Sequence, residues 1–532
     1  MRLYYIIGIR CPGPGRRSVS TVYKRQIIIE YFTLFTPFSH ITLFTVPPLC
    51  YTILMNQEKA LARNTAIQII GKTMATMLGV VTVAILARHL GVAGYGQFTI
   101  ALSFLSIFAV IVDFGLTLTT TQMISEHKAD EETLLGNLLS LRIISAVIFL
   151  ALAPIIALLF PYDNVILMAI AVGSVSYLFG TTSQMLIGIY QKRLIIGRAI
   201  VAEVANRAIV MIGVLLCPIF NIGLIGVIWI LVLGNAVQLF LMVLLARKYV
   251  KLRLKIKLGI WKEIIKRSWP IGASIFFNLI YLRGDIVFLS LFRSNAEVGI
   301  YGAAYKVVDV VASIPVMYMG ITLPILVAAW SAHNSEKFKK IMQKSFDFFA
   351  IAAIPVIFGS IAIGVPLMEW IAGAEFSESG RVLAILGPAV AVVFFGSLFG
   401  HAIVAIQKQK PMTWGYLAVA VLTVAGYIYF IPTYGMWAAA WLTLFSEALI
   451  TILTFTVIFK VSDYRPKIAM ATRAILASIV MFLLLRALPN IHVVFSLLLA
   501  MVVYAIALTA LGGPKLKDVM GLFLPEKPTI NI

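Results

Sequence analysis

The chain has 532 residues, of which 61% are hydrophobic and only 12% are charged. Soluble domains are about one quarter charged, so this composition excludes a soluble globular protein and predicts an integral membrane protein. The net charge of +21 would suggest a nucleic-acid partner in a soluble protein, but basic cytoplasmic loops explain it here, and we expect no nucleic-acid partner. The three cysteines have neither zinc-ligand nor disulfide-framework spacing, so no metal site is expected.

The first part of the chain, 1–54, differs from the rest. It combines a basic start with an apolar stretch that is interrupted by Glu30 and Pro37. A span here would give every later loop the wrong charge bias, and no small-residue cleavage site follows a clean apolar core. We interpret 1–54 as an extension upstream of a natural start at Met55. A genuine peripheral segment is the alternative.

From Thr65 onward, apolar runs of about 20 residues follow one another, each long enough to cross a bilayer. They predict an all-α protein with about fourteen membrane-spanning helices. The predicted spans are 65–87, 97–119, 138–160, 165–190, 199–219, 222–245, 269–292, 299–327, 347–371, 381–406, 412–431, 435–459, 469–487 and 491–511.

The connections between these spans alternate in charge. Every second connection is rich in Lys and Arg, most of all the segment 247–268, except the acidic connection at 126–132; acidic residues count for little in this rule. The connections between them hold little beyond Arg88, Arg293, Arg381 and Arg486. Because basic loops stay in the cytoplasm, we expect both termini to be cytoplasmic. The cations of 247–268 alternate with leucine and isoleucine, which predicts an amphipathic linker at the membrane surface; a plain solvated linker is the alternative.

The two halves of the chain share residues at a constant offset. Three positions in the first half recur 212 positions later: Gly223, Trp229 and Asn235 match Gly435, Trp441 and Glu447. This offset indicates a duplicated six-helix unit. Because six is even, both copies enter the membrane from the same side, which makes the repeat parallel and places a shared cavity between two lobes.

This repeat divides the chain into five segments. The sequence predicts an extension (1–54), an N-terminal six-helix lobe (55–246), a basic linker (247–268), a C-terminal six-helix lobe (269–460), and two additional helices with a cytoplasmic tail (461–532).

Ionisable residues inside the predicted spans are candidate functional residues, because a charge at the bilayer centre costs roughly 3 kcal/mol. Lys72 has no local counter-charge, which favours a place in the cavity. Glu447 also has no local cation, and we consider it a binding site for a proton or a coupling ion. Arg283 and Asp285 are two positions apart and therefore splay around their helix.

Structural roles remain open for several charges. Lys306 and Asp309 can neutralise each other or reach Arg283 and Asp285, which would form a four-charge clamp between two helices. Glu203 and Arg207 have the spacing of an internal ion pair. Two further residues have structural rather than functional explanations. Arg142 lies near enough to the membrane interface for its charged group to reach water, and His401 fits a packing role.

No catalytic motif accompanies these charges. The sequence holds no phosphate-binding glycine loop, no HExxH and no GxSxG in a soluble domain. The loops are also too short to house an enzyme. We therefore expect a protein that is not an enzyme, driven by ion gradients or by the charge of its own substrate.

Four motifs carry a family resemblance. They are Arg88-His-Leu-Gly91-Val-Ala-Gly94-Tyr95-Gly96-Gln-Phe98, Asp113-Phe-Gly115-Leu, Arg283-Gly-Asp285, and Glu297-Val-Gly299-Ile-Tyr301-Gly-Ala-Ala304-Tyr305-Lys306. In this order, over about 60–510, the chain resembles the polysaccharide transporter (O-antigen flippase) family of the multidrug/oligosaccharidyl-lipid/polysaccharide exporter superfamily.

The resemblance implies two six-helix lobes that alternate between inward-open and outward-open states. It also implies movement of a polyprenyl-pyrophosphate-linked oligosaccharide across the plasma (inner) membrane of a prokaryote. Such a protein would meet membrane lipids and the polysaccharide polymerase and glycosyltransferases of its pathway. Cavity cations would bind the pyrophosphate, and buried acids would couple transport to H⁺ or Na⁺, with no other cofactor. The cations are Lys72, Arg283, Lys306 and Arg207, and the acids are Asp113, Asp285, Asp309 and Glu447.

Three other functions fit the same sequence. A cation-coupled exporter of drugs or organic cations would share the fold but would need cavity acids without matching bases. A peptidoglycan-precursor flippase is a variant of the first function that fits the same sequence. A membrane scaffold that transports nothing would hold every buried charge in a structural pair.

Overall fold

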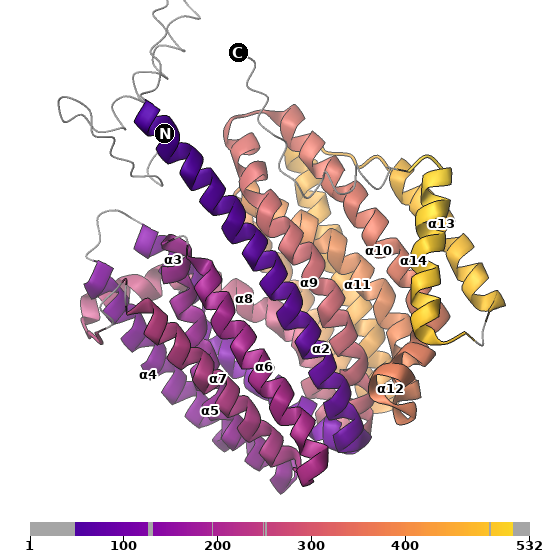
Figure 1. Cartoon of the computed structure of the whole chain (residues 1–532), viewed down its shortest axis with the longest axis horizontal. Coiled ribbons are helices and arrows are strands. Elements are labelled where there is room, and N and C mark those ends of the chain that lie inside the picture. The colour runs from indigo at the N-terminus through magenta and orange to yellow at the C-terminus, as the bar shows by residue number, and fades with distance from the viewer. Residues whose placement is uncertain are drawn as a thin grey trace, which may run out of the picture.

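A computed structural model describes residues 48–125, 131–193, 195–247, 249, 253–488 and 491–513. The segments 1–47, 126–130 and 514–532 lie outside this part, and with them most of the predicted extension and the predicted tail. Within the described part every regular element is a helix, and the helices run roughly alongside one another (Figure 1). The predicted all-α class is confirmed.

All fourteen predicted spans fall on helices. Two helices carry two spans each, because the chain breaks at a glycine inside them: α2 (Pro48–Asp113) at Gly91, with φ 67°, and α12 (Gln409–Ser462) at Gly435, with φ 56°. Glycine adopts this left-handed backbone without strain. One span each lies on α4 (Glu131–Ala157), α5 (Asn164–Lys192), α6 (Ile196–Phe220), α7 (Leu224–Ala246), α8 (Leu258–Phe292), α9 (Asn295–Ser331), α10 (Ser335–Ala372), α11 (Ser377–Ala405), α13 (Ala469–Ala487) and α14 (Val493–Ala510).

The helices form two groups with α2 between them. In Figure 1, α2 runs diagonally between a group formed by α3 (Leu116–Ser125) to α7 and a group formed by α9 to α12. The pair α13 and α14 packs on the outside of α10, where the Tyr504 hydroxyl donates to Ile351 O at 2.8 Å. The residue boundaries of the two lobes stay a prediction.

The hydrophobic cores show where the groups meet. One core combines residues of both groups, among them Phe104, Tyr162, Tyr301 and Leu386. A second core is formed by α3–α7, and Ile260 and Ile264 of α8 pack into it. Within the first group, the shared core holds residues at the helix ends away from the basic connections, such as Ala157 and Cys217, whereas the second core holds residues next to those connections, such as Leu134 and Tyr190. The two groups are therefore packed together on the side away from those connections.

The basic linker is fixed to the first group. Lys255 N donates to Gly136 O at 3.3 Å, and Lys257 N donates to Asn137 Oδ1 at 2.6 Å. A Cβ on Gly136 would lie 2.3 Å from Arg253 O, so the segment 253–257 lies directly on α4. Helix α8 consequently begins against the first group and ends in the second.

Candidate functional site: a charged pocket between the two groups

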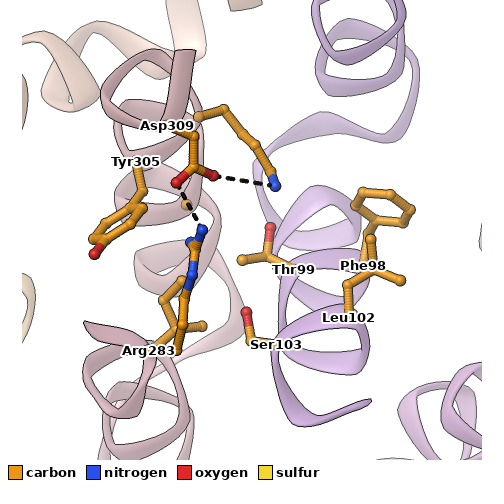
Figure 2. A pocket seen from close by; sticks show the side chains of 10 residues that line it. Phe98, Thr99, Leu102, Ser103, Arg283, Tyr305 and Asp309 are labelled. Carbon is orange, nitrogen blue, oxygen red and sulfur yellow. Dashed lines mark hydrogen bonds and ion pairs between the residues drawn. The ribbon is translucent and has the colours of Figure 1, made fainter. Parts of the chain in front are cut away.

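A small polar pocket lies between the second half of α2 and the pair α8–α9. Its wall on α2 is Phe98, Thr99, Leu102 and Ser103. The opposite wall carries the charges, and Figure 2 shows Arg283 beside Asp309 on this side. The lining residues on that side are Arg283, Ile286, Gly302, Tyr305, Lys306 and Asp309.

The pocket lies near the middle of the membrane. Arg283 precedes the end of α8 by nine residues and Lys306 follows the start of α9 by eleven. At 1.5 Å per residue, both side chains begin about 15 Å from the helix ends, which is half of a hydrocarbon core of about 30 Å. Charges at this depth need partners.

One carboxylate serves two cations in this pocket. Arg283 Nη2 lies 2.7 Å from Asp309 Oδ1, and Lys306 Nζ lies 3.6 Å from Asp309 Oδ2. The Arg283 guanidinium also lies over the Tyr305 ring, 4.9 Å from its centre, a favourable cation–π geometry. The three charges sum to +1. Their side chains are 31%, 40% and 29% exposed for Arg283, Lys306 and Asp309, so solvent reaches all three.

The pocket is narrow in this conformation. A water molecule can occupy ≈ 20 Å³ of it, which is room for about one water. A phosphate-sized ligand would therefore require the two groups to separate.

Close backbone contact shuts the side away from the basic connections. A Cβ on Gly96 of α2 would lie 1.7 Å from Asn295 O, and a Cβ on Gly299 of α9 would lie 2.0 Å from Val92 O. Only glycine permits this approach. The motifs that carry the family resemblance are thus contact surfaces, a role that their spacing in the sequence does not reveal.

Two hydrogen bonds reinforce this closure. The Tyr162 and Ser290 hydroxyls lie 2.9 Å apart, and Asn295 Nδ2 donates to Asp163 Oδ2 at 3.2 Å. Both bonds join the connection between α4 and α5 to the α8–α9 junction. The structure is therefore the state that is closed on this side.

Behind the pocket, Asp285 belongs to a separate buried network. It is fully buried and accepts hydrogen bonds from the Tyr301 hydroxyl at 2.5 Å, from Ile286 N at 2.7 Å and from Thr443 Oγ1 at 3.3 Å. Among the described side chains no cation lies within ion-pair distance of it. The clamp between α8 and α9 therefore contains three charges rather than four, because Asp285 points to α12.

Glu447 lies one helical turn after Thr443 on the same face of α12. It is 6% exposed, and its Oε1 has no hydrogen-bond partner within the described part of the chain. Asp285 and Glu447 thus place two buried carboxylates in one group of helices. Sequence reasoning missed the hydroxyls of Tyr301 and Thr443; the four-residue spacing of Thr443 and Glu447 was the available signal.

Asp113 forms a different kind of ion pair. Its Oδ1 lies 2.8 Å from Arg142 Nη1, and Arg142 is fully buried rather than extended to water, so that expectation was wrong. The reason is the break at Phe114 and Gly115, both with positive φ, which leaves Val112 O without its helical partner. Arg142 donates to that oxygen at 3.0 Å and to Thr181 O at 3.1 Å.

The other predicted charges lie away from the pocket walls. Lys72 is exposed on α2 and does not line the pocket. No ion pair joins Glu203 to Arg207 among the described side chains, and Arg207 is exposed. His401 Nδ1 lies 2.7 Å from Ser397 O, a local packing role.

Within the described part, eleven helices are long and apolar enough to cross a membrane, two of them broken at a glycine, and they define a multi-pass membrane protein. Among solved structures, the chain is similar to an inward closed form of the lipid II flippase MurJ (TM-score 0.69, 14% identity, 85% of this chain and 99% of that chain). It is also similar to an inward-facing multidrug resistance MATE family transporter (TM-score 0.62, 13% identity, 73% and 94%).

Sequence comparison gives the family. The model of the family described as "Polysaccharide biosynthesis protein" matches residues 61–330, about half of the chain, and the chain belongs to this family. The predicted family resemblance is confirmed. The chain is 22% identical over 400 residues to the "Probable low-salt glycan biosynthesis flippase Agl15" of Haloferax volcanii (74% of this chain, 82% of the relative). It is 20% identical over 375 residues to the "Succinoglycan biosynthesis transport protein ExoT" of Rhizobium meliloti (70% and 74%).

Proposed function

We propose that this protein is a flippase that moves a polyprenyl-pyrophosphate-linked oligosaccharide from the cytoplasmic to the outer leaflet by alternating access. The observation that carries this proposal is the solvent-reachable pair of cations, Arg283 and Lys306, which share one carboxylate at mid-membrane depth. The names of the relatives, a glycan biosynthesis flippase and a succinoglycan transport protein, support it.

The chemistry of the substrate fits this pocket. A pyrophosphate diester carries about two negative charges, and a guanidinium binds such groups through two parallel hydrogen bonds. Arg207 and Lys72 are exposed and would add positive charge along the entry path. The cell interior is negative, so moving two negative charges outward gains roughly 4–5 kcal/mol per 100 mV. Only the head group crosses, because the lipid tail stays in the bilayer.

Coupling to H⁺ or Na⁺ would use the buried acids. Asp285, with hydroxyls around it, and Glu447, with an unpartnered oxygen, offer the oxygen ligands that such ions require. Asp113 and Asp309, by contrast, are already held by arginines. We assign the coupling role first to Glu447 and Asp285.

The same proposal gives orientation and partners. From the basic connections we infer that both termini lie in the cytoplasm of a prokaryotic cell, beneath the plasma membrane. The substrate would arrive there from glycosyltransferases and leave toward a polysaccharide polymerase. No step of this transport requires enzyme chemistry by the chain itself.

Arg283→Ala tests the proposal, with Arg381→Ala as a matched control, since Arg381 pairs with Glu378 and is 67% exposed outside the pocket. We expect Arg283→Ala to abolish surface glycan and flipping in inside-out vesicles while protein levels stay normal. Normal flipping by Arg283→Ala would refute the assignment of this pocket. Loss of the protein itself would instead make the ion pair a structural clamp.

The charge of the pocket also weighs against export of organic cations. A cation exporter would present acids without matching bases, whereas Asp309 in this pocket faces two cations. Export of a cationic dye by the wild type, abolished by Asp309→Asn, would favour that function instead.

A further inference from the structure

We propose that Asp309 is a resident counter-ion, which occupies the cations of the empty pocket and is replaced by the phosphates of the substrate. Its role would be to let the empty carrier return, rather than to bind substrate or a coupling ion. This inference rests on the proposed function, and the closing experiment separates the two.

Asp309 makes one hydrogen bond and one longer ionic contact with the two cations. One oxygen meets Arg283 at 2.7 Å, and the other lies 3.6 Å from Lys306, which is beyond hydrogen-bond distance. The carboxylate is 29% exposed. Once the two groups separate, an anion entering from solvent can therefore reach both cations and compete with this carboxylate for them.

The Asp113–Arg142 pair shows what a permanent pair looks like in the same chain. Arg142 is fully buried and also holds Val112 O and Thr181 O. Asp113 further accepts from the Thr117 hydroxyl. That pair closes a helix break, whereas Asp309 closes nothing: α9 continues unbroken from Asn295 to Ser331.

The charge balance of the pocket is consistent with replacement of Asp309 by the phosphates of the substrate. With Asp309 in place, the trio carries +1; with a diphosphate on the two cations, their charge is cancelled and Asp309 becomes surplus. Without either anion, two cations would face each other in a space for about one water, which is strongly unfavourable because a buried charge without a partner is destabilising. The empty carrier thus needs Asp309 most while it passes through the closed state.

This role separates two transport modes. Net flipping requires the empty carrier to return, and therefore requires Asp309. Exchange of one substrate for another keeps an anion in the pocket throughout, and therefore does not require it.

The experiment compares wild type, Asp309→Asn and Asp309→Glu in proteoliposomes. The probe is fluorescent undecaprenyl-diphosphate-linked N-acetylglucosamine, and exchange is measured with the unlabelled lipid in the opposite leaflet. Binding is measured with inorganic pyrophosphate on the purified protein. Asp463→Asn is the control, because Asp463 is 72% exposed and lies outside the pocket.

For Asp309→Asn we expect pyrophosphate to bind about tenfold more tightly, net flipping to fall at least about tenfold, and exchange to stay within about twofold of wild type. Asp309→Glu should restore net flipping. Unchanged pyrophosphate affinity, or loss of exchange together with net flipping, would overturn the counter-ion role. A wild type that neither binds pyrophosphate nor flips the probe would instead refute the proposed function.

A double variant covers the case in which Asp309→Asn does not accumulate. Asp309→Asn with Lys306→Gln restores the wild-type net charge of the trio, and we expect it to accumulate and to recover part of the net flipping. Absence of both variants from the membrane would show that Asp309 holds the fold together, and would overturn the proposal.

Discussion

The two predicted repeats place different chemistry at one matched position. Asn235 on α7 donates to Ser176 Oγ at 2.8 Å and accepts from Asn206 at 3.0 Å, so its amide group is satisfied on both sides. Its counterpart 212 positions later is Glu447 on α12, with an oxygen that has no partner in the described part of the chain. Neutral amides join helices in membranes, whereas a buried unpartnered acid indicates function.

The ion pairs divide in the same way. Arg142 and Asp113 in the first repeat are locked into a helix break, while Arg283, Lys306 and Asp309 in the second repeat face a pocket. Of the two predicted repeats, the second therefore carries the charges that face the pocket. The first repeat provides the surface against which they close.

The largest effect is expected from breaking the ion pair between Arg142 and Asp113. Arg142→Ala should destabilise the protein by about 3–5 kcal/mol, because it leaves Asp113 and two carbonyl oxygens without their partner. Thermal unfolding in detergent measures this, with Arg381→Ala expected within about 0.5 kcal/mol of wild type. If Arg142→Ala were as stable as Arg283→Ala, the distinction between a structural pair and a functional pair would be lost.

The second-largest effect is expected at the backbone contact between α2 and α9, which holds the two groups together. Gly299→Ala places a Cβ 2.0 Å from Val92 O, and overpacking costs about 1–3 kcal/mol. We expect the closed state to lose population by about tenfold or more, measured as slower flipping and faster labelling of a cysteine introduced at Ser103. Gly320→Ala is the control, since nothing lies within 4 Å of its Cβ. Equal labelling of both variants would mean that this contact does not gate the pocket.

A third prediction concerns the matched acid. Glu447→Gln should remove the response of flipping to a Na⁺ or proton gradient and lower the driven rate by about five- to 150-fold, the usual range of a coupling energy. Asn235→Asp, which adds an acid to the other repeat, should not create such a response in that variant. A gradient response that survives Glu447→Gln would move the coupling site to Asp285 alone.

The smallest effect is expected at Thr443. Thr443→Val removes one hydrogen bond to Asp285, worth about 1 kcal/mol. The concentration of coupling ion that gives half-maximal flipping should therefore rise about fivefold, with the maximal rate unchanged. A changed maximal rate at constant ion dependence would place Thr443 in the transport step instead.

The number of helices could be predicted from the sequence, because the thickness of the bilayer sets the length of each apolar run. The divergence of Arg283 and Asp285 also followed from their two-residue spacing: one turns to Asp309 and the other to Tyr301. Both predictions rest on local geometry, which the order of residues contains.

The remaining features depend on contacts between distant segments. Arg142 could be placed at a depth, but not beside Val112 O, because the partner oxygen becomes available only when another helix breaks. The contact of Gly96 with Asn295 O likewise joins residues about 200 positions apart. Because these contacts join segments far apart in the chain, a single sequence does not reveal which glycine lies against which backbone atom.

Helix α8 links the two repeats mechanically. Its start rests on α4 through the docked segment 253–257, while Arg283 lies 25 residues further along. At 1.5 Å per residue this is a lever arm of about 38 Å, so a tilt of about 5° at its base displaces Arg283 by about 3 Å. That shift is comparable to the 2.7 Å contact with Asp309. A slight rocking of the first group would therefore suffice to separate the guanidinium from Asp309, which ties the charge balance of the pocket to the orientation of the two groups.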